Sequence, residues 1–221
     1  MSKIKKNSSK ESSADAEERD GEEDLAPADL KIILLGDSAV GKSKLLERFL
    51  MDDFVPRQLS TYALTLYRYS TKLPCDKEVV IDFWDTAGQE RFAKMHPSYY
   101  YQAHACVLVF DVTRKETYKH LNDWYKELRS FCPHIPVLCI ANKIDVKEEV
   151  TTKKFKFPQK HEMPFYFASA ASGTNVVRMF QNAIELGWDY KENSEDDWVK
   201  DVMDMLGEES GGGSVAPSHS K

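Results

Sequence analysis

The chain has 221 residues, of which 42% are hydrophobic, and a formal net charge of -6. This length and apolar fraction predict one soluble domain with a substantial core, and the acidic balance disfavours nucleic acid as the main partner. No apolar run approaches the length of a membrane span. The cysteines lack metal-ligand spacing, so we expect no protein-bound metal cage and reduced, mostly structural thiols of an intracellular protein; they are Cys75, Cys106, Cys132 and Cys139.

The amino-terminal segment, residues 1–28, has a basic stretch, MSKIKKNSSK, followed by an acidic one, ESSADAEERDGEEDL. It is nearly free of large apolar groups, so burial cannot offset the entropy lost on ordering, and we expect a disordered charged arm. The pattern is compatible with an interaction arm and, on composition, more typical of a solvated tail. Without an apolar stretch after the basic residues, it predicts neither a signal peptide nor a membrane anchor.

Apolar strands alternate with helical periodicity over residues 29–192. The strands that we expect are continuous apolar runs, which are typical of a parallel sheet buried on both faces: 31–35, 77–84, 105–112, 136–142 and 165–169. Residues 62–70 alternate more and predict an edge strand. Tyr118, Leu121, Tyr125 and Leu128 recur at helical spacing, as do Val176, Phe180 and Ile184. The alternation predicts a doubly wound α/β domain.

A further short helix is predicted over residues 193–208, before a flexible tail over 209–221. Ser194 and Asp197 resemble a capping box, and Trp198 and Val202 begin an apolar stripe that continues through Met205 and Leu206. Such a short helix is marginal alone, so it must pack on something. The pattern does not choose between its own domain and a partner.

The sequence GDSAVGKS, from Gly36 to Ser43, has the G-x-x-x-x-G-K-S skeleton of a phosphate-binding loop. It follows the strand 31–35 and precedes a helical pattern, which places loop N–H groups and a helix N-terminus toward phosphates. Lys42 is then expected to reach the β- and γ-phosphates and Ser43 to ligate Mg²⁺. The alternative is a simple glycine turn between two core elements.

The sequence FWDTAGQERF lies at the carboxyl end of the strand 77–84. An aspartate at this position, Asp85, suits a Mg²⁺ contact, and Gly88 lets a backbone N–H approach the γ-phosphate. The amide of Gln89 both donates and accepts, so Gln89 is the candidate catalytic residue that orients the attacking water.

The sequence ANKID follows the strand 136–142 and contains Asn142, Lys143 and Asp145. A carboxylate can accept from two adjacent N–H donors of guanine, and adenine presents the wrong pattern for that contact. Asp145 therefore favours GTP over ATP and disfavours a P-loop kinase or ATPase.

At these residues the sequence resembles the Ras-like small GTPases, especially the Rab family, over about residues 30–190. WDTAGQERF, SYY and FDVT have the Rab pattern, while LSTYALTLY, MHPSYY, AHACVLVFDV, IANKID and SAASGTNVV are similar to the Rab-like two branch. The resemblance implies a P-loop GTPase G domain over residues 29–192. Its expected sheet is six-stranded and mostly parallel, with helices on both faces. The implied cofactors are GTP or GDP and Mg²⁺.

The resemblance also implies further site residues. Thr61 matches the switch I threonine that senses the γ-phosphate through Mg²⁺, and Phe54 matches the aromatic that packs against guanine. The Ala170 amide matches the one that meets the guanine oxygen. The implied metal ligands are Ser43, Thr61 and Asp85, and the implied nucleotide-binding residues are Ser38, Ala39, Val40, Gly41, Lys42, Ser43, Lys44, Phe54, Thr61, Gly88, Asn142, Lys143, Asp145, Ser169, Ala170 and Ala171.

Several residues depart from the Rab pattern. The usual T-I-G of switch I reads Thr61-Tyr62-Ala63, and the aromatic expected on the adjoining strand is Leu66, so together with Trp84 and Tyr99 this surface is expected to select different effectors. Ala171 replaces the guanine-loop lysine, whereas Lys143 still supplies an alkyl shelf beside the base. The end of the chain has no cysteine for prenylation, so no stable membrane anchor of that kind is expected.

Ala39 stands where many such loops carry glycine. If its backbone needs a positive φ, the β-carbon costs on the order of 1 kcal/mol and crowds the phosphates. The hypothesis is weaker nucleotide retention and faster spontaneous exchange. The alternative is a harmless methyl group pointing to solvent.

The favoured function is a Mg²⁺-dependent GTP switch with slow intrinsic hydrolysis, since no arginine finger is obvious in the chain. Switch I, about residues 52–66, and switch II, about 86–101, are expected to order around the γ-phosphate. The alternative is a nucleotide-loaded adaptor whose hydrolysis is incidental. The resemblance further implies a monomeric cytoplasmic protein of the cilium or flagellum and basal body, with the intraflagellar transport B complex as partner.

Overall fold

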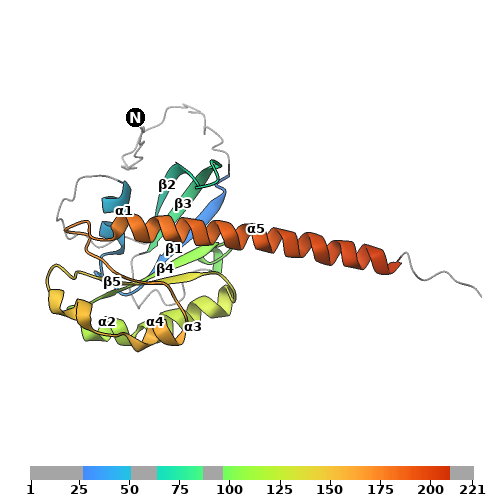
Figure 1. Ribbon diagram of the computed structural model, residues 1–221. Helices are drawn as coiled ribbons and strands as arrows, with labels where there is room; N and C mark the ends of the chain where they lie inside the picture. The colour runs from blue at the N-terminus through green and yellow to red at the C-terminus, as the bar shows by residue number, and fades with distance from the viewer. Residues whose placement is uncertain (1–26, 51–63, 87–96, 210–221) are drawn as a thin grey trace, which may run out of the picture.

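The computed structural model describes residues 27–50, 64–86 and 97–209, with side chains described over 27–50, 65–86 and 97–194. Within these ranges the strands form one six-stranded sheet in the order β2-β3-β1-β4-β5-β6 (Figure 1). The elements in chain order are β1 Leu30–Leu35, α1 Lys42–Leu50, β2 Leu64–Lys72, β3 Glu78–Thr86, η2 Pro97–Tyr99, β4 Ala105–Asp111, α2 Lys115–Lys119, α3 Leu121–Phe131, β5 Val137–Asn142, η3 Glu148–Thr152, α4 Lys156–Lys160, β6 Phe165–Phe167 and α5 Val176–Glu209.

The sheet is parallel except at one edge. β1 pairs in parallel with β3 and β4, with Ile33 opposite both Trp84 and Cys106, whereas β2 pairs with β3 in antiparallel fashion, with Leu66 opposite Trp84. The predicted α/β fold with a mostly parallel sheet is confirmed, as is the edge position of the more alternating strand. Because the other strands are parallel, their carboxyl ends meet at one edge of the sheet.

Helices cover both faces of this sheet, and each face has its own apolar core. In β1, Ile32 and Leu34 belong to the core shared with α1 and α5, while Ile33 and Leu35 belong to the core shared with α3 and α4. Figure 1 shows α1 and α5 on one side of the sheet and α2, α3 and α4 on the other. Burial on both faces explains why these strands read as continuous apolar runs.

The carboxyl-terminal helix differs from the prediction. α5 runs without a break from Val176 to Glu209 and extends well past the sheet (Figure 1). The prediction of a separate short helix over residues 193–208 is wrong, because these residues continue α5. The Ser194 hydroxyl donates to the carbonyl of Lys191 at 2.9 Å, inside the helix. A serine within a helix can satisfy its hydroxyl on the preceding turn, so S-x-x-D does not require a new helix.

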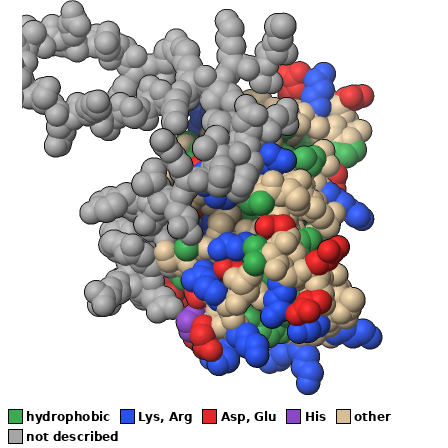
Figure 2. Space-filling view, turned by 90° about the vertical axis from the view of Figure 1, so that its left-hand side faces the viewer, with side chains coloured by type: hydrophobic (Ala, Val, Ile, Leu, Met, Phe, Trp, Pro, Cys, Tyr) green, Lys and Arg blue, Asp and Glu red, His purple; other side chains and the backbone are tan. Residues whose placement is uncertain are grey.

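Charged side chains of both signs share the face shown in Figure 2, with few hydrophobic groups between them. Of the helices in the described part of the chain, none has the length and apolar composition that crossing a membrane requires. Cys106, Cys132 and Cys139 are buried free thiols, whereas Cys75 is exposed. Burial raises the pKa of the Cys106 and Cys139 thiols, which keeps them protonated and structural.

Candidate nucleotide-binding site

The loop between β1 and α1 needs glycine at both of its ends. Gly36 has a φ of 134°, and a β-carbon there would lie 2.1 Å from the carbonyl oxygen of Val109 on β4. Gly41 has a φ of 99°, and its β-carbon would lie 2.4 Å from Asn142 Nδ2. The loop therefore packs closely against β4 and the end of β5. A simple glycine turn, the alternative, would not need such close contacts at both glycines.

Lys42, the first residue of α1, lies across this loop. Its ammonium donates to the carbonyls of Gly36 at 2.7 Å and Asp37 at 3.1 Å, and the side chain is buried. Burial lowers the pKa of Lys42 to about 8, against the opposing effect of the Asp85 and Asp37 carboxylates. A buried cation at a helix N-terminus provides the charge that bound phosphate needs.

Ser43 and Asp85 meet where β3 ends beside the loop. The Ser43 hydroxyl donates to Asp85 Oδ2, and Asp85 is fully buried. Thr86 fixes the end of β3 by donating from Oγ1 to the carbonyl of Leu34 at 2.9 Å. A hydroxyl and a carboxylate are hard oxygen donors, so this pair fits a Mg²⁺ ion that also binds substrate phosphates.

Asn142 joins the phosphate loop to the predicted guanine loop. Its Nδ2 donates to the carbonyl of Val40 at 2.8 Å, and its Oδ1 accepts from the Ala170 N–H at 3.2 Å. In this structure the Ala170 amide, expected to meet the base oxygen, therefore donates to Asn142. Ser169 donates from Oγ to Asp145 Oδ1 at 2.5 Å, which orients the carboxylate predicted to read guanine.

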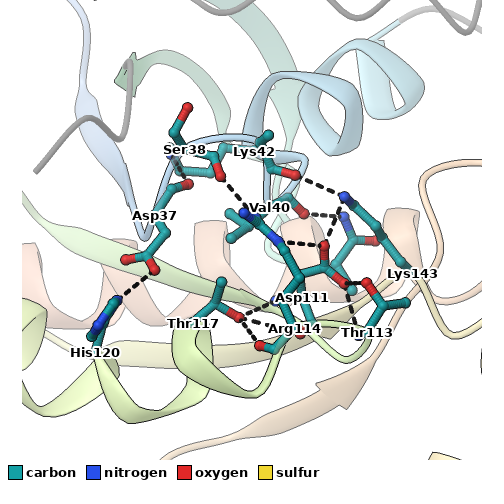
Figure 3. Close-up of polar contacts among 12 residues, drawn as sticks. Asp37, Ser38, Val40, Lys42, Asp111, Thr113, Arg114, Thr117, His120 and Lys143 are labelled. Atoms are coloured by element: carbon teal, nitrogen blue, oxygen red, sulfur yellow. Dashed lines mark hydrogen bonds and ion pairs between the residues drawn. The ribbon is translucent and has the colours of Figure 1, made fainter.

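Lys143 contacts the outer side of the phosphate loop. Its ammonium donates to the carbonyl of Ala39 at 2.7 Å and pairs with Asp111 Oδ2 at 2.8 Å. Burial opposes the ionisation of Asp111, but hydrogen bonds from Lys143 and Thr113 outweigh it and lower the pKa of the carboxyl. Arg114 donates from Nε to the same Asp111 oxygen and from Nη2 to the carbonyl of Ser38 at 2.8 Å (Figure 3).

Asp37 joins the phosphate loop to His120 and to Trp124 of α3, a role that the sequence did not predict. Its Oδ1 accepts from Trp124 Nε1 at 2.7 Å. Its Oδ2 lies 2.7 Å from His120 Nδ1, as Figure 3 shows. Asp37 is buried, so these partners stabilise a carboxylate that would otherwise be costly to bury. An acid inside a glycine-rich loop followed much later by His and Trp gives no local signal of this contact.

The remaining predicted residues divide into two groups. Lys44 pairs with Glu47 at 2.6 Å, so its side chain points away from the loop, while its backbone N–H lies in the first turn of α1. Ala171 is exposed in the guanine loop. Four predicted residues lie outside the described part of the chain: Phe54, Thr61, Gly88 and Gln89.

Three residues of the expected effector surface lie in the described part of the chain: Leu66, Trp84 and Tyr99. Leu66 on β2 is 47% exposed and lies opposite Trp84. The Lys31 ammonium lies over the Trp84 ring, 3.6 Å from its centroid. Tyr99 is buried, and its hydroxyl lies 2.9 Å from the carbonyl of Trp84 and 3.1 Å from that of Leu34. The prediction that Tyr99 presents its side chain on this surface is therefore wrong: it supports Trp84 from inside.

The fold and these motifs define a guanine-nucleotide-binding P-loop protein, and comparison with known proteins agrees. Residues 31–187 match the Ras family, so the chain belongs to the Ras family of small GTPases, which bind GTP and GDP with Mg²⁺ and hydrolyse GTP.

The relatives of the chain indicate a narrower group within this family. The chain is 59% identical to Rab-like protein 2A of Pongo abelii over 82% of this chain and 78% of that protein. It is 61% identical to Rab-like protein 2A of Mus musculus over 80% and 78%, and 38% identical to Ras-related protein Rab-18 of Caenorhabditis elegans over 71% and 78%. The predicted likeness to Rab-like small GTPases is confirmed.

Proposed function

We propose that this chain is a molecular switch that hydrolyses GTP slowly and changes its partner binding between the GTP and GDP states. The nucleotide-binding part of the proposal rests on the Asn142 side chain, which bonds both to Val40 in the phosphate loop and to Ala170 in the guanine loop. One side chain thus couples the part of the site that holds phosphate to the part that selects the base.

The described residues divide the work of binding. Asp145, oriented by Ser169, presents a carboxylate to the adjacent N–H donors of guanine. The Lys42 ammonium lies within the loop, where it neutralises phosphate charge. Mg²⁺, which Ser43 and Asp85 would hold, supplies further charge neutralisation at the β- and γ-phosphates.

Slow hydrolysis follows from where the nearby arginine points. An arginine finger accelerates phosphoryl transfer by contacting the transition-state charge. Arg114 contacts the loop, but its guanidinium donates to the Ser38 carbonyl and to Asp111. A group bound in this way is not directed at a γ-phosphate, so Arg114 does not act as an arginine finger, and we expect rapid turnover to need an arginine from an activating protein.

The hydrolytic role predicted for Gln89 is tested by replacing it with leucine. We expect single-turnover hydrolysis of GTP by Gln89→Leu to fall at least about tenfold, because a leucine cannot orient the attacking water. Gln159→Leu, an exposed change on α4, serves as the control and should hydrolyse GTP at the wild-type rate. Unchanged hydrolysis in Gln89→Leu would contradict the role.

We further propose that the switch acts in ciliary assembly, at the basal body and with the intraflagellar transport B complex. This proposal rests on the resemblance to the Rab-like two branch described above. Crosslinking mass spectrometry on Gln89→Leu protein in a ciliated cell, with GDP-loaded wild-type protein as the comparison, should recover these proteins with the GTP form. Equal recovery with both forms would instead support the adaptor alternative, and recovery of other partners would contradict the ciliary role.

A further inference from the structure

Successive carbonyls on the outer side of the phosphate loop each accept a hydrogen bond from a side chain outside the loop. Arg114 Nη2 donates to Ser38 at 2.8 Å, Lys143 Nζ to Ala39 at 2.7 Å, and Asn142 Nδ2 to Val40 at 2.8 Å. We call Arg114, Lys143 and Asn142 the carbonyl clamp. Lys143 and Asn142 belong to the guanine motif, whereas Arg114 belongs to no nucleotide motif.

The clamp determines where the N–H groups of the loop point. A trans peptide is planar, so its C=O and the N–H of the next residue point in opposite directions. Holding the Ser38 carbonyl outward therefore turns the Ala39 N–H toward the inside of the loop. The carbonyls of Ala39 and Val40 act in the same way on the N–H groups of Val40 and Gly41. The clamp thus prearranges the donors that a bound phosphate uses.

Arg114 is built to hold its position. It is the N-cap residue of α2 and has extended backbone angles, with φ of -121° and ψ of 101°. Its Nε donates to Asp111 Oδ2 at 3.1 Å, and the same carboxylate oxygen pairs with Lys143 at 2.8 Å. One buried carboxylate therefore directs both cations onto neighbouring carbonyls of the loop, as Figure 3 shows. The planar guanidinium of Arg114 bonds the carboxylate through Nε and the carbonyl through Nη2, so its orientation is fixed at two points.

The clamp acts at a strained position. Ala39 has a φ of 60°, a left-handed conformation that costs a non-glycine residue on the order of 1 kcal/mol. The peptides on either side of Ala39 are those whose carbonyls bond to Arg114 and Lys143. Rotation of either peptide would relieve the strain and would also turn an N–H group away from the phosphates, so the clamp opposes that rotation.

We propose that Arg114 is a positioning residue that controls how long nucleotide stays bound, by holding the Ser38–Ala39 peptide in its strained orientation. The inference rests on the proposed function, because it requires that the loop binds nucleotide. It adds a residue from the loop between β4 and α2 to the residues that control exchange.

The test measures release of a fluorescent GDP derivative into excess unlabelled GDP at fixed Mg²⁺. We expect Arg114→Ala to release it about three to ten times faster than wild type, the range expected for the loss of one typical hydrogen bond, since solvent screens the partly exposed guanidinium. Arg114→Lys should be intermediate, and Lys115→Ala, an exposed neighbour, should match wild type. Release from Arg114→Ala at the wild-type rate would overturn the inference.

A second comparison separates positioning from a loss of general stability. In an Ala39→Gly background the strain is absent, so Arg114→Ala should accelerate release by a smaller factor than in wild type. An equal factor in both backgrounds would contradict control through the strained peptide. If wild-type protein itself fails to retain the labelled GDP, the proposed function fails before any variant is compared.

Discussion

The left-handed backbone of Ala39 has a direct consequence for nucleotide retention. From the sequence, we expect strain at Ala39 only if its φ is positive. The structure gives Ala39 a φ of 60°, so the strain is present. Arg114 could not be found in the same way, because its contact with Ser38 depends on how the loop after β4 approaches the loop after β1. Asn142 and Lys143 hold the loop and follow a local motif, whereas the contact of Arg114 depends on tertiary structure.

Replacing Ala39 with glycine should slow nucleotide release. Glycine adopts a positive φ without the β-carbon penalty, so the bound loop loses on the order of 1 kcal/mol of strain, which corresponds to about fivefold slower release. The fluorescent GDP release assay measures this directly. Equal rates for Ala39→Gly and wild type would favour the alternative that the methyl group is harmless.

At the scale of elements, the strands were predictable because their apolar runs are uninterrupted, as in β4, where every residue is buried. Helix boundaries were less predictable. Tyr118 and Leu121 share a helical spacing, yet they lie in separate helices, α2 and α3, on either side of His120. In α5, by contrast, the pattern at Ser194 predicts a boundary that is absent, because the chain is already helical there and no N–H groups need a cap.

Asp111 connects the end of β4 to the end of β5, and its charge should stabilise the fold. Asp111→Asn keeps the shape but weakens the bonds from Lys143, Arg114 and Thr113, so we expect the free energy of unfolding at pH 7 to fall by about 1 to 3 kcal/mol. Urea unfolding measures the loss. Asp189→Asn, an exposed change on α5, should leave stability nearly unchanged.

The pH dependence of that loss has a definite sign. The folded protein lowers the pKa of Asp111, so its contribution is complete above the unfolded pKa of about 3.9 and is lost as pH falls through the lower folded value. The stability difference between wild type and Asp111→Asn should therefore be constant from pH 7 to about pH 5 and shrink below about pH 4. A difference that grows on acidification would contradict this assignment.

At the scale of the whole molecule, the parallel sheet brings the site together. β1, β3 and β5 end at the same edge, so the phosphate loop, Asp85 and Asn142 meet although they are far apart in the sequence. The order of these motifs was enough to predict the fold and the class of nucleotide. The predicted switch residues Thr61 and Gln89 lie outside the described ranges and remain predictions.

If Asp145 selects guanine nucleotides, replacing its carboxylate should change the base that the chain prefers. Xanthine has a carbonyl where guanine has its amino group, so an asparagine amide complements xanthine as a carboxylate complements guanine. Wild-type protein and the exposed control Asp123→Asn should bind GDP far more tightly than xanthosine diphosphate or ADP. Asp145→Asn should reverse the preference between GDP and xanthosine diphosphate. Equal binding of ADP and GDP by wild type, or an unchanged preference in Asp145→Asn, would contradict the claim.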